Sequence, residues 1–322
     1  MIELLIQNKE TGEAFDVSNM VSGTIQWQQK LDLSPGKLNF TLEQGTSKFV
    51  SEGSPVQFKV DNQEVFFGYV FKYTLNEKKQ IECTAYDQIR YLKYKDTYAF
   101  TGLSCEAIFK KICSEKELKF KIEHSCGYVL PQRFNDNKTL ADMLQYSFDK
   151  TLIDTGQWMF IRDDFGTLKL LDIDKEKTDL VIGNESLLKS FSFESSIDGD
   201  TYNQIKLTQE NKATAKRDTY IVKDPSTIAK WGILQYHETA DESLNAAQIE
   251  QLATQYLERY NKPKRTLKLP CLGDLKVRAG KGVYLSINDL NNVIKNNAFA
   301  IVIGVDHSFS NCMHTMEVEV IV

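Results

Sequence analysis

The chain has no long apolar run and little proline. No stretch of 18 apolar residues occurs, so the sequence predicts no transmembrane helix. Only 6 Pro and 17 Gly among 322 residues exclude collagen-like and low-complexity structure. The first residues include an acidic side chain and lack a basic stretch, so we expect no Sec signal peptide. A chain of this length, 42% hydrophobic, can bury more than one core.

Excess positive charge is also missing. The formal net charge is -5, from 39 basic and 44 acidic residues. None of the regions 1–98, 99–185 and 186–322 has more basic than acidic residues. We interpret the short basic run at residues 262–265 as a solvated helix end. The sequence therefore predicts no specific nucleic-acid binding.

Closely paired cysteines are absent. The six cysteines are Cys83, Cys105, Cys113, Cys126, Cys271 and Cys312, and no CxxC occurs. Without a signal peptide, reduced thiols in a cytoplasm are expected. Cys105, Cys113 and Cys126 lie near His124 in the sequence, which raises the possibility of a zinc site. The spacings lack the close ligand pairs of such sites. We therefore predict small buried side chains and no metal.

Enzyme motifs are absent as well. The sequence contains no GxSxG, HExxH, Walker A or GxGxxG. Gly280-Lys-Gly282 is too short for a phosphate loop, and we interpret it as a turn before a strand. His307 and His314 flank a turn near Cys312, but a catalytic Cys–His pair needs a pocket that a sequence cannot show. We predict that the protein is not an enzyme and has no catalytic, cofactor-binding or metal-binding residues.

Other candidate residues have structural explanations. Paired carboxylates at Asp163 and Asp164 are better explained as a hairpin turn. A cation site has no EF-hand spacing to support it; its candidate residues are Asp198, Asp200, Asp241 and Glu242. A sugar-binding platform is less favoured than burial in a core or an interface; its candidates are Trp27, Trp158 and Trp231.

Hydrophobic periodicity divides the chain into three regions. Period-two alternation through residues 1–98 predicts antiparallel strands of a small barrel or sandwich. Residues 99–185 mix strands with two helices, capped at Ser104 and at Thr139, where Thr139 and Asp142 form a capping box. Strands return over residues 186–322, interrupted by an amphipathic helix at 244–262. The sequence predicts a β-dominated α+β fold with two similar antiparallel β-barrels and an inserted α+β domain.

An internal repeat connects the two β regions. Residues 53–60, 67–70 and 81–85 match residues 280–287, 303–305 and 316–320. The shared pattern is a turn glycine, an alternating strand, a strand with a central glycine, and another alternating strand. Either two meanders look alike by chance, or one barrel occurs twice. Three chains with two barrels each would form a pseudo-sixfold ring that could dock onto a sixfold tube.

Five segments resemble a known family. They are Met1–Ile6, Ile25–Trp27, Ser34–Leu42, Tyr202–Leu207 and Ala229–Tyr236. They resemble the XkdQ-type tail proteins of PBSX-like prophages, which are similar to the central hub of contractile phage baseplates and of phage-tail-like bacteriocins. The resemblance covers essentially the whole chain, and KWGILQY is its most specific part.

The resemblance implies an architectural protein without turnover. It implies a homotrimer that joins a hexameric tail tube or tube initiator to a trimeric spike, beside other baseplate proteins such as LysM-type partners. The tape-measure protein would end in the lumen, and near-neutral charge would suit a lumen that does not hold DNA. The expected location is the bacterial cytoplasm during assembly and then the released particle. The alternatives are a tail-associated cell-wall hydrolase, a carbohydrate- or receptor-binding module, and a hexameric tube initiator, which the second barrel disfavours.

Overall fold

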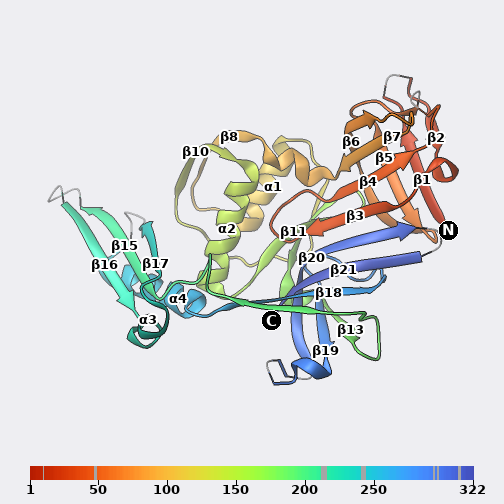
Figure 1. Cartoon of the computed structure of the whole chain (residues 1–322). Coiled ribbons are helices and arrows are strands. Elements are labelled where there is room, and N and C mark those ends of the chain that lie inside the picture. Colours follow the sequence, from red (N-terminus) through yellow and green to blue (C-terminus); the bar gives the residue numbers. More distant parts are fainter. Residues whose placement is uncertain are drawn as a thin grey trace. The chain divides into compact units, whose positions relative to one another are not determined.

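The chain forms two compact units. The computed structural model describes residues 1–9, 11–46, 49–211, 216–240, 244–292, 294–295, 297–310 and 313–322 (Figure 1). The first unit comprises Met1–Ser192 and Leu267–Val322, and the second comprises Phe193–Thr266. The second unit contains the helix expected within 186–322. The expected boundaries near residues 98 and 185 lie inside the first unit and stay predictions.

Residues 1–98 form antiparallel strands around a core that Phe309 of the C-terminal region also enters. The strands are β1 (Ile2–Gln7), β2 (Ala14–Asp16), β3 (Ile25–Lys30), β4 (Lys37–Leu42), β5 (Pro55–Val60), β6 (Gln63–Leu75) and β7 (Ile81–Tyr86). Alternate residues point inward, so that Leu38 pairs with Ala85 and Phe40 with Cys83, all of them buried. This alternation is the pattern from which the strands were predicted.

The C-terminal strands continue the same sheet. They are β13 (Lys177–Gly183), β14 (Ser192–Ser196), β18 (Lys264–Leu272), β19 (Gly282–Ser286), β20 (Ala298–Ser310) and β21 (Met313–Ile321). β3 pairs antiparallel with β20, with Trp27 opposite His307 (Figure 1). The two expected barrel regions are therefore joined by a continuous ladder, which the hydrophobic pattern of the sequence did not predict. The expected β-dominated α+β fold class is confirmed.

The internal repeat is present at the level of strand register. In the N-terminal copy, Val56 pairs with Gly68 and Val70 with Ala85. In the C-terminal copy, Val283 pairs with Ala300 and Val302 with Val320. A register shift follows directly after Val70 in β6 and after Val302 in β20. Both central strands have 13 residues. These matches define equivalent positions in the two copies, and β6 is the counterpart of β20.

Two helices and five short strands, which form two small sheets, lie between these regions in the sequence. They are β8 (Lys95–Phe100), α1 (Cys105–Glu115), β9 (Phe120–Ile122), β10 (Arg133–Thr139), α2 (Leu140–Thr155), β11 (Met159–Asp163) and β12 (Leu168–Asp172). The Ser104 side chain accepts from the Ala107 N–H, and Thr139 and Asp142 form the expected capping box. The apolar faces of α1 and α2 bury Phe109, Leu144 and their neighbours in one cluster. Short 3-10 helices span Ser18–Met20, Gln88–Lys93, Ile173–Lys175 and Asn288–Leu290.

The second unit is a three-stranded sheet with two helices. Its elements are β15 (Gln204–Asn211), β16 (Lys216–Lys223), α3 (Pro225–Trp231), β17 (Gln235–Thr239) and α4 (Ala246–Tyr260). The strand order is β16-β15-β17. The expected amphipathic stripe of α4 buries Ile249, Leu252 and Tyr256. The Tyr236 and Tyr256 hydroxyls both donate to one carboxylate oxygen of Glu238.

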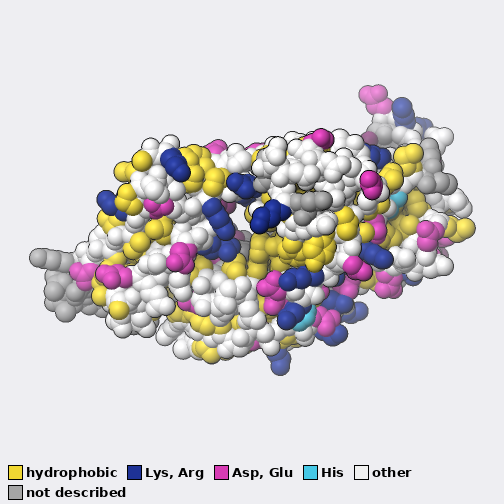
Figure 2. All heavy atoms as spheres, turned by 90° about the horizontal axis from the view of Figure 1, so that it is seen from below, with side chains coloured by type: hydrophobic (Ala, Val, Ile, Leu, Met, Phe, Trp, Pro, Cys, Tyr) yellow, Lys and Arg dark blue, Asp and Glu magenta, His cyan; other side chains and the backbone are white. Residues whose placement is uncertain are grey.

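Charges of both signs are interspersed on the face shown in Figure 2. Lys and Arg side chains there do not gather into one block, which agrees with the absence of a net basic region in the sequence. Within the described residues, no helix combines the length and the apolarity that a membrane crossing needs.

Candidate functional site: a charged junction in the first unit

The β11–β12 hairpin carries two aspartates to a junction between three parts of the first unit. Asp163 ends β11, and Phe165 and Gly166 take positive φ values of 49° and 83° in the turn. The predicted hairpin turn is thus present. The two carboxyl groups have separate partners. Asp163 is buried and accepts from the backbone N–H groups of Gly166 and Gln88, at 2.7 and 3.2 Å.

A second buried aspartate lies beside Asp163. Asp87 accepts from the backbone N–H of Gly36 at 2.8 Å and from that of Ile89 at 3.0 Å. Burial, and then the charge of Asp163, raise the pKa of Asp87 well above its ordinary value. Burial likewise raises the pKa of Asp163. Both carboxyl groups are therefore harder to ionise in this junction than in water.

Arg278, from the loop before β19, connects the hairpin to the C-terminal region. Its guanidinium donates to the Asp164 carboxylate at 2.7 Å and to the Asp163 carbonyl at 2.8 Å. Lys169 lies 2.5 Å from the other Asp164 oxygen. Burial alone would raise the pKa of Asp164. The hydrogen bond from Lys169 and the Arg278 charge outweigh burial and lower this pKa to about 2. Asp164 is therefore ionised and paired.

A second ion-pair cluster binds the same hairpin to the segment after β12. Arg162 and Lys281 each lie 2.7 Å from the same Glu176 oxygen, and Arg162 is almost wholly buried. The Arg162 Nε has no hydrogen-bond partner within the described residues. These contacts add a second connection between the hairpin and the loop that contains Arg278.

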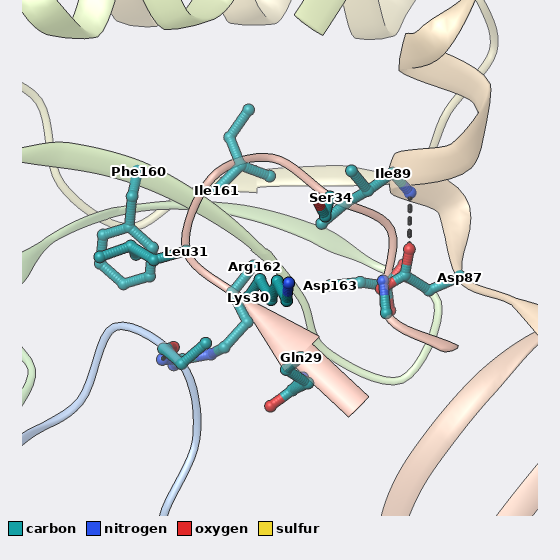
Figure 3. A pocket seen from close by; sticks show the side chains of 12 residues that line it. Gln29, Lys30, Leu31, Ser34, Asp87, Ile89, Phe160, Ile161, Arg162 and Asp163 are labelled. Carbon is teal, nitrogen blue, oxygen red and sulfur yellow. Dashed lines mark hydrogen bonds between the residues drawn. The ribbon is translucent and has the colours of Figure 1, made fainter. Parts of the chain in front are cut away.

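A small cavity lies inside the junction (Figure 3). Its volume is about 10 Å³, which is room for a single water molecule. It is lined by Gln29, Lys30, Leu31, Ser34, Gly36, Asp87, Ile89, Phe160, Ile161, Arg162, Asp163 and Ala279. A water there could accept from Arg162. The cavity cannot hold a substrate, so the junction is suited to holding three segments together.

His307 is a buried neutral base near this junction. Its Nε2 lies 3.0 Å from the Val277 carbonyl, which can only accept, so Nε2 carries the proton and Nδ1 accepts from His314 at 2.9 Å. Burial, and then the neighbouring His314, lower the pKa of His307 to about 3. Its ring stacks on Trp27 at 4.9 Å. The hypothesised partner Cys312 lies outside the described residues.

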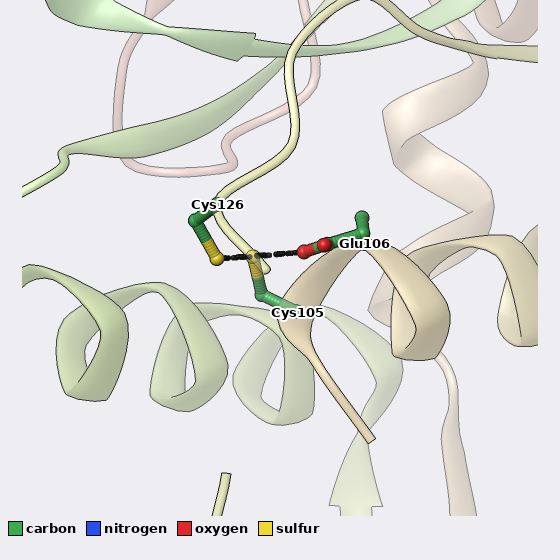
Figure 4. Close-up of side chains that lie close together, drawn as sticks. All are labelled: Cys105, Glu106 and Cys126. Carbon is green, nitrogen blue, oxygen red and sulfur yellow. Dashed lines mark hydrogen bonds between the residues drawn. The ribbon is translucent and has the colours of Figure 1, made fainter. Parts of the chain in front are cut away.

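Three side chains come close at the start of α1 (Figure 4). The Cys105 and Cys126 sulfurs are 3.5 Å apart, and a Glu106 carboxylate oxygen lies 3.3 and 3.4 Å from them. Within the described part of the chain, this group could hold a metal ion. Of the four residues considered from the sequence, the structure brings Cys105 and Cys126 together. His124 instead accepts from the Asp172 backbone N–H.

Each remaining candidate that the structure describes has its own place in the fold. Trp27 is buried in β3, Trp158 is partly buried before β11, and Trp231 ends α3. Asp198 and Asp200 are exposed, and Asp241 and Glu242 lie outside the described residues. Gly280 has a φ of 83° in the turn before β19, as expected for a turn. The basic run at 262–265 follows α4 and enters β18.

Sequence reasoning missed the partners that complete both clusters. Arg278 lies 114 residues from Asp164, and no local pattern signals such a pair. Glu106 was also missed, although the sequence did contain a signal for it, because Glu106 directly follows Cys105 in the first turn of a predicted helix. That adjacency was available in the sequence.

The family of the chain follows from sequence comparison. The profile of the YQBQ-like family matches residues 25–321, so the chain belongs to this family. The chain is 29% identical over 285 residues to the uncharacterized protein YqbQ of Bacillus subtilis strain 168, which covers 87% of this chain and 85% of that protein. It is 28% identical over 276 residues to the phage-like element PBSX protein XkdQ of the same strain, with coverages of 84% and 82%. The resemblance to XkdQ-type proteins is confirmed.

Solved structures share the fold. A tail protein from Neisseria meningitidis MC58 matches with a TM-score of 0.72 at 13% identity, over 100% of this chain and 96% of that one. The 43 kDa tail protein of prophage MuSo2 from Shewanella oneidensis matches with a TM-score of 0.69 at 12% identity, with coverages of 99% and 98%. At these identities the likeness concerns the fold.

Proposed function

We propose that the protein is a structural subunit of a phage-type tail, the hub that joins tail tube and spike. The names of XkdQ and of the two tail proteins support the tail assignment. The junction, which holds a cavity for one water only, supports an architectural role without catalysis. The subunit would assemble in the bacterial cytoplasm and then form part of the particle.

The trimeric ring is supported by one difference between the repeats. In β20, residues 304–307 pair with β21 on one edge and with β3 on the other. The equivalent residues 72–75 of β6 pair with β7 only, among the described residues. Tyr73 and Leu75 are 40% and 61% exposed, whereas their counterparts Val305 and His307 are 2% and 0% exposed. The N-terminal copy thus lacks one strand that the C-terminal copy has.

A second copy of the chain would supply that strand. β14 pairs with β18 as β3 pairs with β4, and among the described residues β14 stands at the end of the sheet path with no second partner strand. Adding β14 of one copy to β6 of the next is a head-to-tail contact, which closes into a ring if the rotation allows. Three chains would then place six similar β regions around one axis. Tube or tube initiator, spike and LysM-type proteins would bind its faces, and the tape-measure end would occupy its lumen.

The test is the solution mass of the chain with one edge residue changed. Light scattering across a concentration series should give the mass of three chains, each of 36.9 kDa, for the natural protein alone, and that mass plus the mass of the spike when a spike protein is bound. Leu75→Glu should reduce this to a monomer, because a buried unpaired charge is costly at a strand interface. Val129→Glu is the matched control, since Val129 is 58% exposed and lies away from this edge. Equal trimer formation by both variants would refute the edge contact.

A further inference from the structure

The cluster at the start of α1 combines two sulfur atoms with one carboxylate. Cys105 and Glu106 are the first two residues of the helix, and Cys126 lies in the segment after β9 (Figure 4). Cys105 is fully buried, whereas Cys126 and Glu106 are partly exposed. A segment distant in sequence thus meets the helix start through side chains of types that ligate zinc.

The distances match one face of a zinc coordination tetrahedron. Zinc binds sulfur at about 2.3 Å and carboxylate oxygen at about 2.0–2.2 Å, so tetrahedral ligands lie about 3.8 Å (sulfur to sulfur) and about 3.6 Å (sulfur to oxygen) apart. The observed separations are 3.5 Å between the sulfurs and 3.3 and 3.4 Å from sulfur to oxygen. Outward shifts of a few tenths of an ångström would admit the ion.

The surroundings favour a cation. Glu106 forms no ion pair with a Lys or Arg of the described residues. One Glu106 oxygen accepts from the Gly127 N–H at 3.0 Å, and the other points at the two sulfurs. The Tyr128 N–H donates to the Cys126 sulfur at 3.4 Å, a typical outer contact of a metal-bound thiolate. The N-terminus of α1 also favours negative charge on its first residues.

We propose that Cys105, Glu106 and Cys126 bind one zinc-like divalent cation, with solvent as the fourth ligand. The inference is independent of the proposed function. Spacing alone disfavoured a metal site, but folding brings two of the cysteines together and adds Glu106. Bound metal would fasten the segment containing Cys126 to the start of α1. Cysteine binds metal as a thiolate, so binding should release thiol protons.

The test uses the purified 322-residue chain, fully reduced, with Zn²⁺ and Cd²⁺ as the probes. After dialysis against Zn²⁺, elemental analysis should find one equivalent of tightly bound zinc per chain. Cd²⁺ should produce a thiolate-to-metal charge-transfer band. Cys126→Ala should abolish both signals, and Glu106→Gln should weaken Zn²⁺ affinity at least tenfold, as lost metal-site contacts do. Zn²⁺ should raise the melting temperature of the natural chain but not of Cys126→Ala.

Cys113→Ala is the matched control. Cys113 is a buried cysteine of the same helix outside the cluster, so its variant should keep the zinc stoichiometry and the absorption band. Equal zinc content in Cys126→Ala and the natural chain would overturn the proposal. The proposal would also be overturned if the metal-free protein formed a Cys105–Cys126 disulfide in air and bound no Zn²⁺ after reduction.

Discussion

Arg278 and Asp164 are 114 residues apart in sequence and form a hydrogen-bonded ion pair at 2.7 Å. The pair joins the loop before β19 to the β11–β12 hairpin. The same guanidinium lies over the Trp27 ring at 5.5 Å, so one side chain contacts three parts of the first unit. The junction is therefore sensitive to the loss of this single residue.

We predict that Arg278→Ala lowers the free energy of unfolding by about 2 kcal/mol, because hydrogen bonds to charged groups contribute about that much when one partner is buried. Asp164 would keep only Lys169 as a cationic partner. Urea unfolding followed by tryptophan fluorescence measures the change, since Trp27 is near the altered site.

Arg217→Ala is the control for that measurement. Its ion pair with Glu210 is exposed on both sides, and exposed pairs contribute about 0–1 kcal/mol. If both variants lose the same stability, the junction has no special role in holding the first unit together.

The internal repeat was predicted from the sequence, but the predicted alignment of its central glycines was wrong. The matches of 53–60 with 280–287 and of 81–85 with 316–320 agree with the observed register, because alternation continues through these strands. Gly68 and Gly304 were matched to each other, yet Gly68 is equivalent to Ala300 and Gly304 to Lys72. The two glycines have different neighbours in the folded chain, and a pattern of residue types does not reveal those neighbours.

Gly68→Ala should destabilise the protein by about 1–3 kcal/mol, the usual cost of overpacking. An added Cβ would lie against the Tyr86 carbonyl oxygen and 2.7 Å from its carbonyl carbon, and backbone cannot easily move away. Gly304→Ala should be nearly neutral, since the heavy atom nearest to its added Cβ would be a Glu319 side-chain oxygen at 3.6 Å. Thermal unfolding of both variants compares them directly; equal melting temperatures would contradict the close approach at Gly68.

Local features were predictable because local residues determine them. The caps at Ser104 and Thr139 and the turn after Asp163 depend on neighbours within four residues, and all three are present. The β3–β20 ladder and the Arg278 contacts depend on residues brought together by folding. Those features decide how the two β regions are joined, and no alternation pattern contains them.

The buried His307 should make stability fall with acidity. Its pKa is lowered from 6.5 to about 3 on folding, so between these values the unfolded chain binds a proton that the folded chain does not. The contribution of neutral His307 to the free energy of unfolding is therefore intact above pH 6.5. It is lost as pH falls from 6.5 toward 3, by up to about 1.4 kcal/mol per pH unit. The raised pKa values of Asp87 and Asp163 act in the opposite direction, with stability lost as pH rises above the ordinary carboxyl range.

Comparing the pH dependence of stability in the natural chain and in His307→Gln isolates the contribution of His307, because Asp87 and Asp163 contribute to both proteins. His307→Gln keeps a donor for the Val277 carbonyl and does not titrate. Urea unfolding at several pH values between 7.5 and 4.5 should give a steeper loss of stability for the natural chain than for the variant. His314, which also has a lowered pKa, remains in both proteins. Parallel curves would mean that His307 takes up its proton equally in the folded and unfolded states, and the neutral tautomer inferred from the Val277 contact would then be wrong.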